Sequence, residues 1–88
     1  MNQHAWTQVH GAKSINCIAA KFVQKVGKYD GVRVTIELLD GSKKHANGRS
    51  LLGVLGLDTK DKDVRITVSG ENQSNNQKIA EELATLLV

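Results

Sequence analysis

An alternating apolar segment followed by a tight turn constrains the fold of this chain more than any other feature. Val32, Val34, Ile36 and Leu38 alternate with more polar residues, which is the spacing of a strand with one buried face. Asp40-Gly41 comes next, and this dipeptide is a strong hairpin signal. Residues 43–47 are polar, so we expect them to form the partner strand at a sheet edge.

The segment before this hairpin has the apolar spacing of a helix. Between residues 15 and 26 apolar side chains recur at every third or fourth position. Ser14 or Asn16 can cap the start of this helix, and Gly27 ends it. The sequence therefore predicts a helix that runs from about Ser14 to Gly27.

Two shorter signals predict helices in the second half of the chain. Ser50 precedes an apolar stretch in which Leu51, Leu52 and Leu55 share one helical face. Near the C-terminus, residues 74–77 have the S-x-x-Q form of a capping box, and the apolar residues after them recur with helical spacing.

Two more strands complete the expected fold. Residues 3–9 favour a strand, although Trp6 argues for one buried face and Ala5 for the other, and Val64, Ile66 and Val68 alternate clearly. The element order is β-α-β-β-α-β-α. It predicts an α+β protein, an open-faced two-layer sandwich of a four-stranded antiparallel sheet with three helices on one face. A length of 88 residues fits one domain, over residues 1–88.

Composition narrows the classes of function. The net charge of +3 is uneven, with an excess of five positive charges in residues 1–50 and of two negative charges in residues 51–88. The basic part lacks the interleaved aromatic residues on which bases stack, so we expect no nucleic acid partner. An acidic protein partner fits the charges at least as well, and a plain solvated face is the commonest explanation of such charges. No apolar run fits a signal peptide or a membrane span. A single cysteine, Cys17, excludes an internal disulfide and is typical of a reducing cytoplasm.

The sequence holds no constellation typical of an enzyme. It has no glycine-rich phosphate loop and no carboxylate pair at enzymatic spacing. His4, His10, Cys17 and His45 lack the spacing of metal ligands. We therefore expect no catalytic residues, no metal and no cofactor.

Two motifs in the right order resemble the phosphocarrier protein HPr. They are the helix end from Phe22-Val23-Gln24 to Lys28-Tyr29-Asp30 and the segment Ser50-Leu51-Leu52-Gly53-Val54-Leu55-Gly56-Leu57. The resemblance covers essentially the whole chain, apart from extra residues in the hairpin at positions 40–44. It implies the element order above and a place in the bacterial phosphoenolpyruvate-dependent sugar phosphotransferase system.

The resemblance fails at the residues that carry phosphate. The first helix of the family opens with a G-[LI]-H-A-R-P-A pattern, whose histidine accepts the phosphoryl group from enzyme I. Aligned on that pattern, Ile15 takes the histidine position and Cys17 takes the arginine position. Isoleucine has no nucleophilic atom, and the bidentate phosphate partner is lost as well. Two alternative phosphoacceptors stay open: Cys17, whose place in a first helical turn favours a thiolate, and His10.

The Ser50 segment matches the regulatory site of the family. In Gram-positive members a dedicated kinase phosphorylates the corresponding serine, which weakens the carrier role and promotes binding to a transcriptional regulator. The resemblance implies that Ser50 is such a site, while capping of the helix is its simpler role.

The apolar faces of the first two helices dock partners in this family. Their counterparts here are Ala19, Ala20, Phe22, Leu51, Leu52 and Leu55, of which some must belong to the core. We therefore expect a regulatory or adaptor binding protein that lacks histidine phosphocarrier activity. Ala20, Arg49, Leu51, Leu52 and Leu55 are its predicted docking surface, and its predicted partners are a serine kinase, a transcriptional regulator or phosphotransferase-system components.

Overall fold

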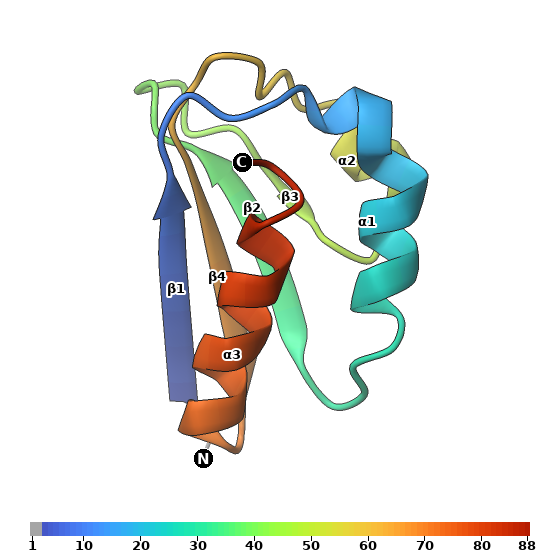
Figure 1. The fold of residues 1–88 in the computed structure, drawn as a ribbon, viewed down its shortest axis with the longest axis vertical. Helices are drawn as coiled ribbons and strands as arrows, with labels where there is room; N and C mark the ends of the chain where they lie inside the picture. Colours follow the sequence, from blue (N-terminus) through green and yellow to red (C-terminus); the bar gives the residue numbers. More distant parts are fainter. Residues whose placement is uncertain (1–2) are drawn as a thin grey trace.

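The computed structural model describes residues 3–88, which form one sheet and a set of helices beside it (Figure 1). The strands are β1 (Gln3–Val9), β2 (Arg33–Leu38), β3 (His45–Asn47) and β4 (Val64–Gly70). The helices are α1 (Ala19–Val26), α2 (Leu51–Leu55) and α3 (Gln73–Ala84), and a short 3-10 helix, η1 (Ile15–Ile18), precedes α1. The predicted element order is confirmed.

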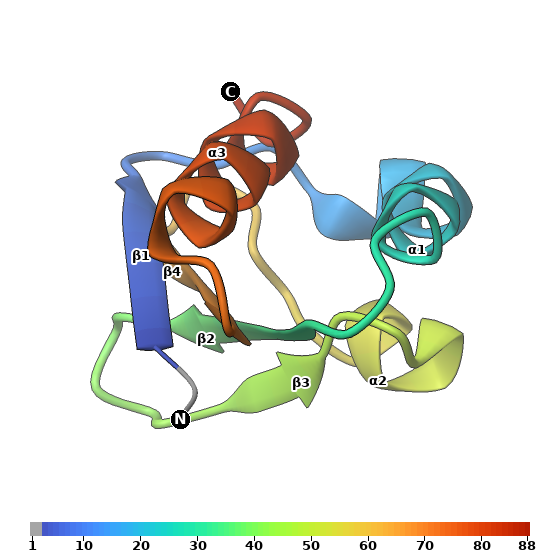
Figure 2. The same ribbon diagram turned by 90° about the horizontal axis from the view of Figure 1, so that it is seen from below.

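The four strands form an antiparallel sheet in the order β1-β4-β2-β3. The hairpin at Asp40-Gly41 is confirmed, with Gly41 and Lys43 at φ +88° and +60° in the turn. The partner strand β3 is only three residues long and forms one edge of the sheet. The sheet and the helices form the two layers of the predicted α+β sandwich (Figure 2).

The structure resolves the register of β1. Ala5 and Val9 are buried toward the helices, while Trp6 faces the open side of the sheet with 52% of its surface exposed. The guanidinium carbon of Arg65 lies 4.9 Å from the centroid of the Trp6 ring, which is a cation–π contact on that open side.

The core between the layers is almost entirely aliphatic, with one aromatic ring, Phe22, at its centre. Alternate residues of β2 and β4 supply its sheet side, and α1 and α3 supply its helix side. The largest fully buried side chains are Phe22, Ile15, Ile36, Ile66, Ile79, Leu83 and Leu87.

Two helix starts differ from the sequence prediction. Ser14 precedes η1 but makes no side-chain cap bond, and Ile18, the last residue of η1, leaves the helical conformation at φ −130° directly before α1. Helix α3 begins at Gln73, because the side chain of Asn72 accepts the Asn75 N–H at 3.0 Å. The predicted capping box at residues 74–77 is therefore wrong, since an asparagine two residues earlier supplies the cap.

Candidate functional site

Ser50 lies directly before α2 and caps it. Its backbone is extended, at φ −99° and ψ 109°, and its Oγ accepts the Gly53 N–H at 3.0 Å. A Cβ at position 53 would lie 3.1 Å from that Oγ, so glycine leaves the serine the room for this bond. The capping role of Ser50 is thus present in the structure, and Gly53 is part of it.

Arg49 holds the start of α2 against the end of α1. Its guanidinium donates to three backbone carbonyls, those of Val26, Tyr29 and Val32, the last at 2.9 Å. Its own backbone N–H bonds the Asn47 side chain at 2.9 Å. The hydrogen bonds of this guanidinium thus go to the last residue of α1 and to the loop after it. Arg49 therefore connects the start of α2 to the end of α1 and places a positive charge near Ser50.

Helix α2 exposes three leucines, which we name the leucine ridge (Leu51, Leu52 and Leu55). Leu52 is 83% exposed and the other two are a little over 40% exposed, while Val54 points into the core. Large exposed apolar side chains that are contiguous mark interaction surfaces. The expected docking residues of α1 fall into two groups. Ala19 and Phe22 are buried and belong to the core, whereas Ala20 is exposed and can contact a partner.

A shallow groove joins the leucine ridge to the start of α1. It has a volume of about 450 Å³. Its lining residues are Asn16, Cys17, Ile18, Ala19, Ala20, Lys21, Leu51 and Leu55. The structure therefore brings together two segments that lie far apart in sequence, the expected phosphoacceptor turn and the expected regulatory segment, as Figure 1 shows for α1 and α2.

Ile15 is fully buried in the core. Its backbone N–H donates to the Thr59 Oγ1 at 2.8 Å, and the Thr59 hydroxyl donates in turn to the Lys13 carbonyl at 2.7 Å. Thr59 is itself fully buried and takes the place of the expected Ser14 cap. A phosphoryl group that passes between proteins needs a solvent-accessible acceptor. The Ile15 side chain is not accessible to solvent and has no nucleophilic atom that could accept a phosphoryl group.

Cys17 is exposed at the end of the same turn. Its side chain is therefore not part of the apolar core. A second depression, of about 430 Å³, lies on its other side and is lined in part by Lys13, Lys60 and Asp61. The thiol thus lies between two shallow hollows whose linings include lysines.

His10 lies in the loop after β1 and lines neither of these hollows. Its Nδ1 is 3.4 Å from Asp63 Oδ2, and its side chain is 77% exposed. The Gly11 backbone N–H, followed by His10, holds the pKa of Asp63 below its ordinary value. The pairing gives His10 a local partner away from the α1–α2 groove.

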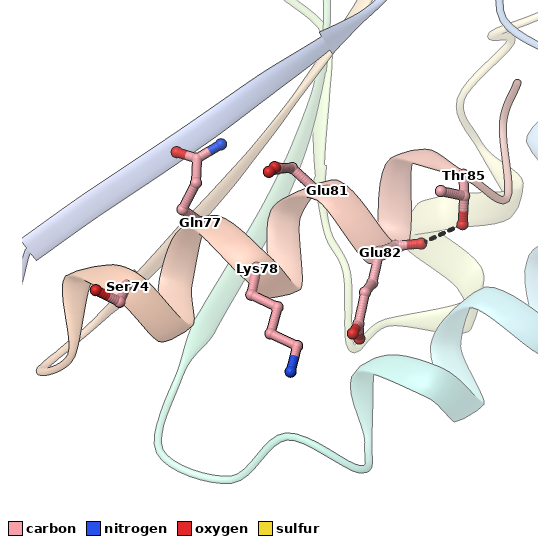
Figure 3. A pocket seen from close by; sticks show the side chains of 6 residues that line it. All are labelled: Ser74, Gln77, Lys78, Glu81, Glu82 and Thr85. Carbon is pink, nitrogen blue, oxygen red and sulfur yellow. Dashed lines mark hydrogen bonds between the residues drawn. The ribbon is translucent and has the colours of Figure 1, made fainter.

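A further depression, on the outer surface of α3, does not gather reactive groups. Its lining residues are Ser74, Gln77, Lys78, Glu81, Glu82 and Thr85, around about 350 Å³. Figure 3 shows that Gln77 and Glu81 extend to one side of the helix and Lys78 and Glu82 to the other. The Tyr29 hydroxyl donates to Glu82, which connects the loop after α1 to α3. These contacts are those of a solvated helix surface.

Within residues 3–88, no three His, Cys, Asp or Glu side chains are grouped as ligands for a metal ion. None of the helices in that range has the length and apolar character required to cross a bilayer.

Comparison with known proteins defines the class. The sequence model of the family described as "PTS HPr component phosphorylation site" matches residues 17–88. The chain therefore belongs to the HPr family, the phosphocarriers of the phosphotransferase system. The match begins at Cys17 and so leaves out Ile15.

Solved structures share the fold. The phosphocarrier protein HPr from Bacillus anthracis superposes with a TM-score of 0.77 at 21% identity, over 97% of this chain and 98% of that one. HPr-C-His from Thermoanaerobacter tengcongensis gives a TM-score of 0.62 at 20% identity, over 94% and 91% of the two chains. A comparison with curated proteins finds no match. The expected family and fold are both confirmed.

Proposed function

We propose that this chain is an HPr-like binding protein without histidine phosphocarrier activity, in which residues 1–88 act as one regulatory or adaptor domain. The observation that carries the proposal is the contrast between Ile15 and the leucine ridge. The residue aligned with the phosphoacceptor is fully buried, whereas three leucines beside it are exposed. Loss of the carrier chemistry thus coincides with retention of an apolar surface.

The charge around the docking surface (Ala20, Arg49, Leu51, Leu52 and Leu55) suggests the chemistry of its partner. Lys21 lines the groove beside the leucine ridge, and Arg49 is exposed just before the ridge. A partner with an apolar patch and acidic residues around it would match both features. Phosphotransferase-system components and a transcriptional regulator are the partners that the family suggests.

Docking can be tested with two lysine substitutions. Leu52→Lys places a charge on the most exposed leucine, and Thr35→Lys places the same charge on the opposite, open face of the sheet. With purified enzyme I and the family's transcriptional regulator as probes, titration calorimetry should show binding lost in Leu52→Lys and retained in Thr35→Lys. Equal effects of the two substitutions, or no binding of the native chain to either probe, would contradict docking through the leucine ridge.

Ser50 is the proposed site of regulatory phosphorylation. Its hydroxyl is only half-buried and lies next to the leucine ridge, so an added phosphate would change the charge of the docking surface directly. Incubation with ATP and the family's serine kinase should label the native chain and leave Ser50→Ala unlabelled. Labelling that persists in Ser50→Ala would place the modification elsewhere.

A second function, a phosphocarrier with a non-standard acceptor, is favoured by one observation, the exposure of Cys17. This function requires an accessible nucleophile that takes a phosphoryl group from enzyme I. No gain of a phosphoryl group by the native chain would exclude it. Cys17→Ser and His10→Gln then separate the two candidate acceptors in any phosphoryl-transfer assay.

A further inference from the structure

The face of the sheet that points away from the helices exposes a single aromatic ring on a polar surface. Trp6 is 52% exposed, and the other outward side chains of β1, β2, β3 and β4 are polar or charged, because they alternate with the buried apolar ones. The leucine ridge and the hollows beside it lie on the helix side, so the proposed docking surface does not use this ring. The functions considered above therefore leave the exposure of Trp6 unexplained.

Arg65 of β4 supports the Trp6 ring from one side. Its guanidinium carbon lies over the ring, 4.9 Å from the centroid, and its Nε is buried without a hydrogen-bond partner within residues 3–88. One face of the ring thus rests on Arg65, and the exposed half of the Trp6 surface includes the other face. A ring supported in this way is a platform on which a second planar group can stack.

Three polar residues continue from Trp6 straight across the sheet. In the strand register Trp6 lies opposite Thr67 of β4, and Thr67 lies opposite Thr35 of β2. Thr35 in turn lies opposite Asn47 of the edge strand β3. Because neighbouring strands are about 4.8 Å apart, the row is about 14 Å long, which is room for two or three nucleotides of a single strand. The two hydroxyls and the amide along it can hydrogen-bond to bases or sugars.

The charge of this face is complementary to phosphate groups. Its formal charges are Arg33, Arg65 and Glu37, an excess of one positive charge, and Lys43 and Lys44 come just before β3. Glu37 accepts a hydrogen bond from Arg65 Nη1 at 3.4 Å. Arg33 is exposed, and its side chain makes no hydrogen bond within residues 3–88. An aromatic platform beside exposed cations is the combination that binds single-stranded nucleic acid.

We propose that the open face of the sheet binds single-stranded nucleic acid, with one base stacked on the outer side of Trp6 and phosphates close to the exposed cations of this face. An acidic protein would meet the same charges but would bring no base to the ring. Sequence spacing led to the opposite expectation, because Trp6 is far from Arg33 and Arg65 along the chain and only the sheet brings them to one face. The proposal does not depend on the proposed function.

The emission of Trp6, the only tryptophan, tests the stacking directly. Titration of the native chain with an oligouridine of about ten nucleotides, at about 50 mM salt, should quench this emission to a saturating value. Oligodeoxythymidine of the same length distinguishes RNA from DNA as the strand that binds, and quenching by either one supports the proposal. A polyglutamate of the same charge should leave the emission unchanged. Unchanged emission with both oligonucleotides, or equal quenching by polyglutamate, would overturn the proposal.

Variants separate the contribution of the ring from that of the charge. Trp6→Leu should weaken binding about tenfold or more, and Trp6→Phe, which keeps a ring, should recover most of the affinity. Arg33→Gln should weaken binding about two- to fivefold and reduce its salt dependence. Lys78→Gln removes the same charge from the outer surface of α3 and should bind normally.

Fluorescence anisotropy of a labelled oligouridine measures these affinities, and circular dichroism checks that each variant is folded. A folded Trp6→Leu variant that binds like the native chain would contradict the proposal. Equal losses in Arg33→Gln and Lys78→Gln would contradict it as well, because the charge of the whole chain, and not this face, would then hold the strand.

Discussion

At the scale of single residues, the burial of Ile15 decides what the turn before α1 can do. The side chain is fully enclosed and its backbone N–H is bonded to the buried Thr59. A histidine placed there would have to desolvate its ring nitrogens. The position therefore serves packing in this chain.

Restoring the family's histidine should consequently cost stability without restoring activity. We predict that Ile15→His lowers the free energy of unfolding by about 2–4 kcal/mol, because a polar ring replaces a fully buried aliphatic side chain. Asn16→His, at the exposed neighbouring position, should change it by less than about 0.5 kcal/mol. Urea denaturation of the two variants checks this, and equal stabilities would show that position 15 can open to solvent.

Ser50 offers a second prediction at this scale. Ser50→Ala removes the acceptor for the Gly53 N–H and should destabilise the protein by about 1 kcal/mol. Ser50→Asp retains a capping oxygen and should stay close to the native value. The midpoints of urea unfolding measure both. If Ser50→Asp loses as much as Ser50→Ala, the cap bond does not contribute as described.

At the scale of elements, Arg49 connects α2 to the end of α1 through its three carbonyl partners. We predict that Arg49→Lys costs about 1–2 kcal/mol of unfolding free energy, because an ammonium cannot reproduce the planar fork of donors. Arg33→Lys is the matched control, since Arg33 is exposed on β2 and no hydrogen bond of its side chain is present within residues 3–88. Similar losses in the two variants would mean that these hydrogen bonds of Arg49 are dispensable.

The β2–β3 hairpin carries a pH-dependent contact. Hydrogen bonds from Ser42, side chain first and backbone second, lower the pKa of Asp40 to about 2, and Lys62 adds to the effect. Because the folded pKa lies below the unfolded value, the stabilisation is present above pH 3.8 and is lost as pH falls toward 2. Asp40→Asn should therefore be less stable than the native chain at pH 6 and equally stable near pH 2, in urea titrations at both values. A difference that persists at pH 2 would contradict this origin.

Sequence patterns predicted the elements well where one face is buried over several residues. The alternation from Val32 to Leu38 and the Asp40-Gly41 turn gave the central hairpin, because period and turn chemistry depend only on neighbouring residues. The helix starts were less predictable. Thr59, 44 residues from Ile15, supplies the acceptor that Ser14 was expected to provide, and such a contact leaves no local signal.

In the candidate site too, features set by neighbouring residues were predictable from the sequence, and features set by distant contacts were not. Its residue types and their order were readable from sequence, and the helical position of the leucine ridge followed from spacing. Exposure was not readable, because burial of Phe22 and exposure of Ala20 depend on how α1 meets α2. The carbonyl partners of Arg49 were likewise not predictable, since they lie at the end of α1 and in the loop after it, which only the fold brings near Arg49.

At the scale of the whole molecule, the fold separates three surfaces. The α1–α2 side carries the proposed docking surface, the open face of the sheet carries Trp6, and β1 presents an uncharged edge. The proposed docking surface lies away from β1 and from the open face of the sheet, so single substitutions there leave the other two surfaces unchanged. The central claim is that the HPr fold persists here without its histidine carrier reaction.

That claim is tested most directly by intact-mass spectrometry after incubation with phosphoenolpyruvate and enzyme I. The HPr from Bacillus anthracis, placed in the same reaction, serves as the positive control. We predict that the control gains the mass of one phosphoryl group and that this chain gains none. An enzyme I-dependent phosphoryl group on this chain, lost in Cys17→Ser or in His10→Gln, would contradict the account and identify the acceptor that replaces the histidine.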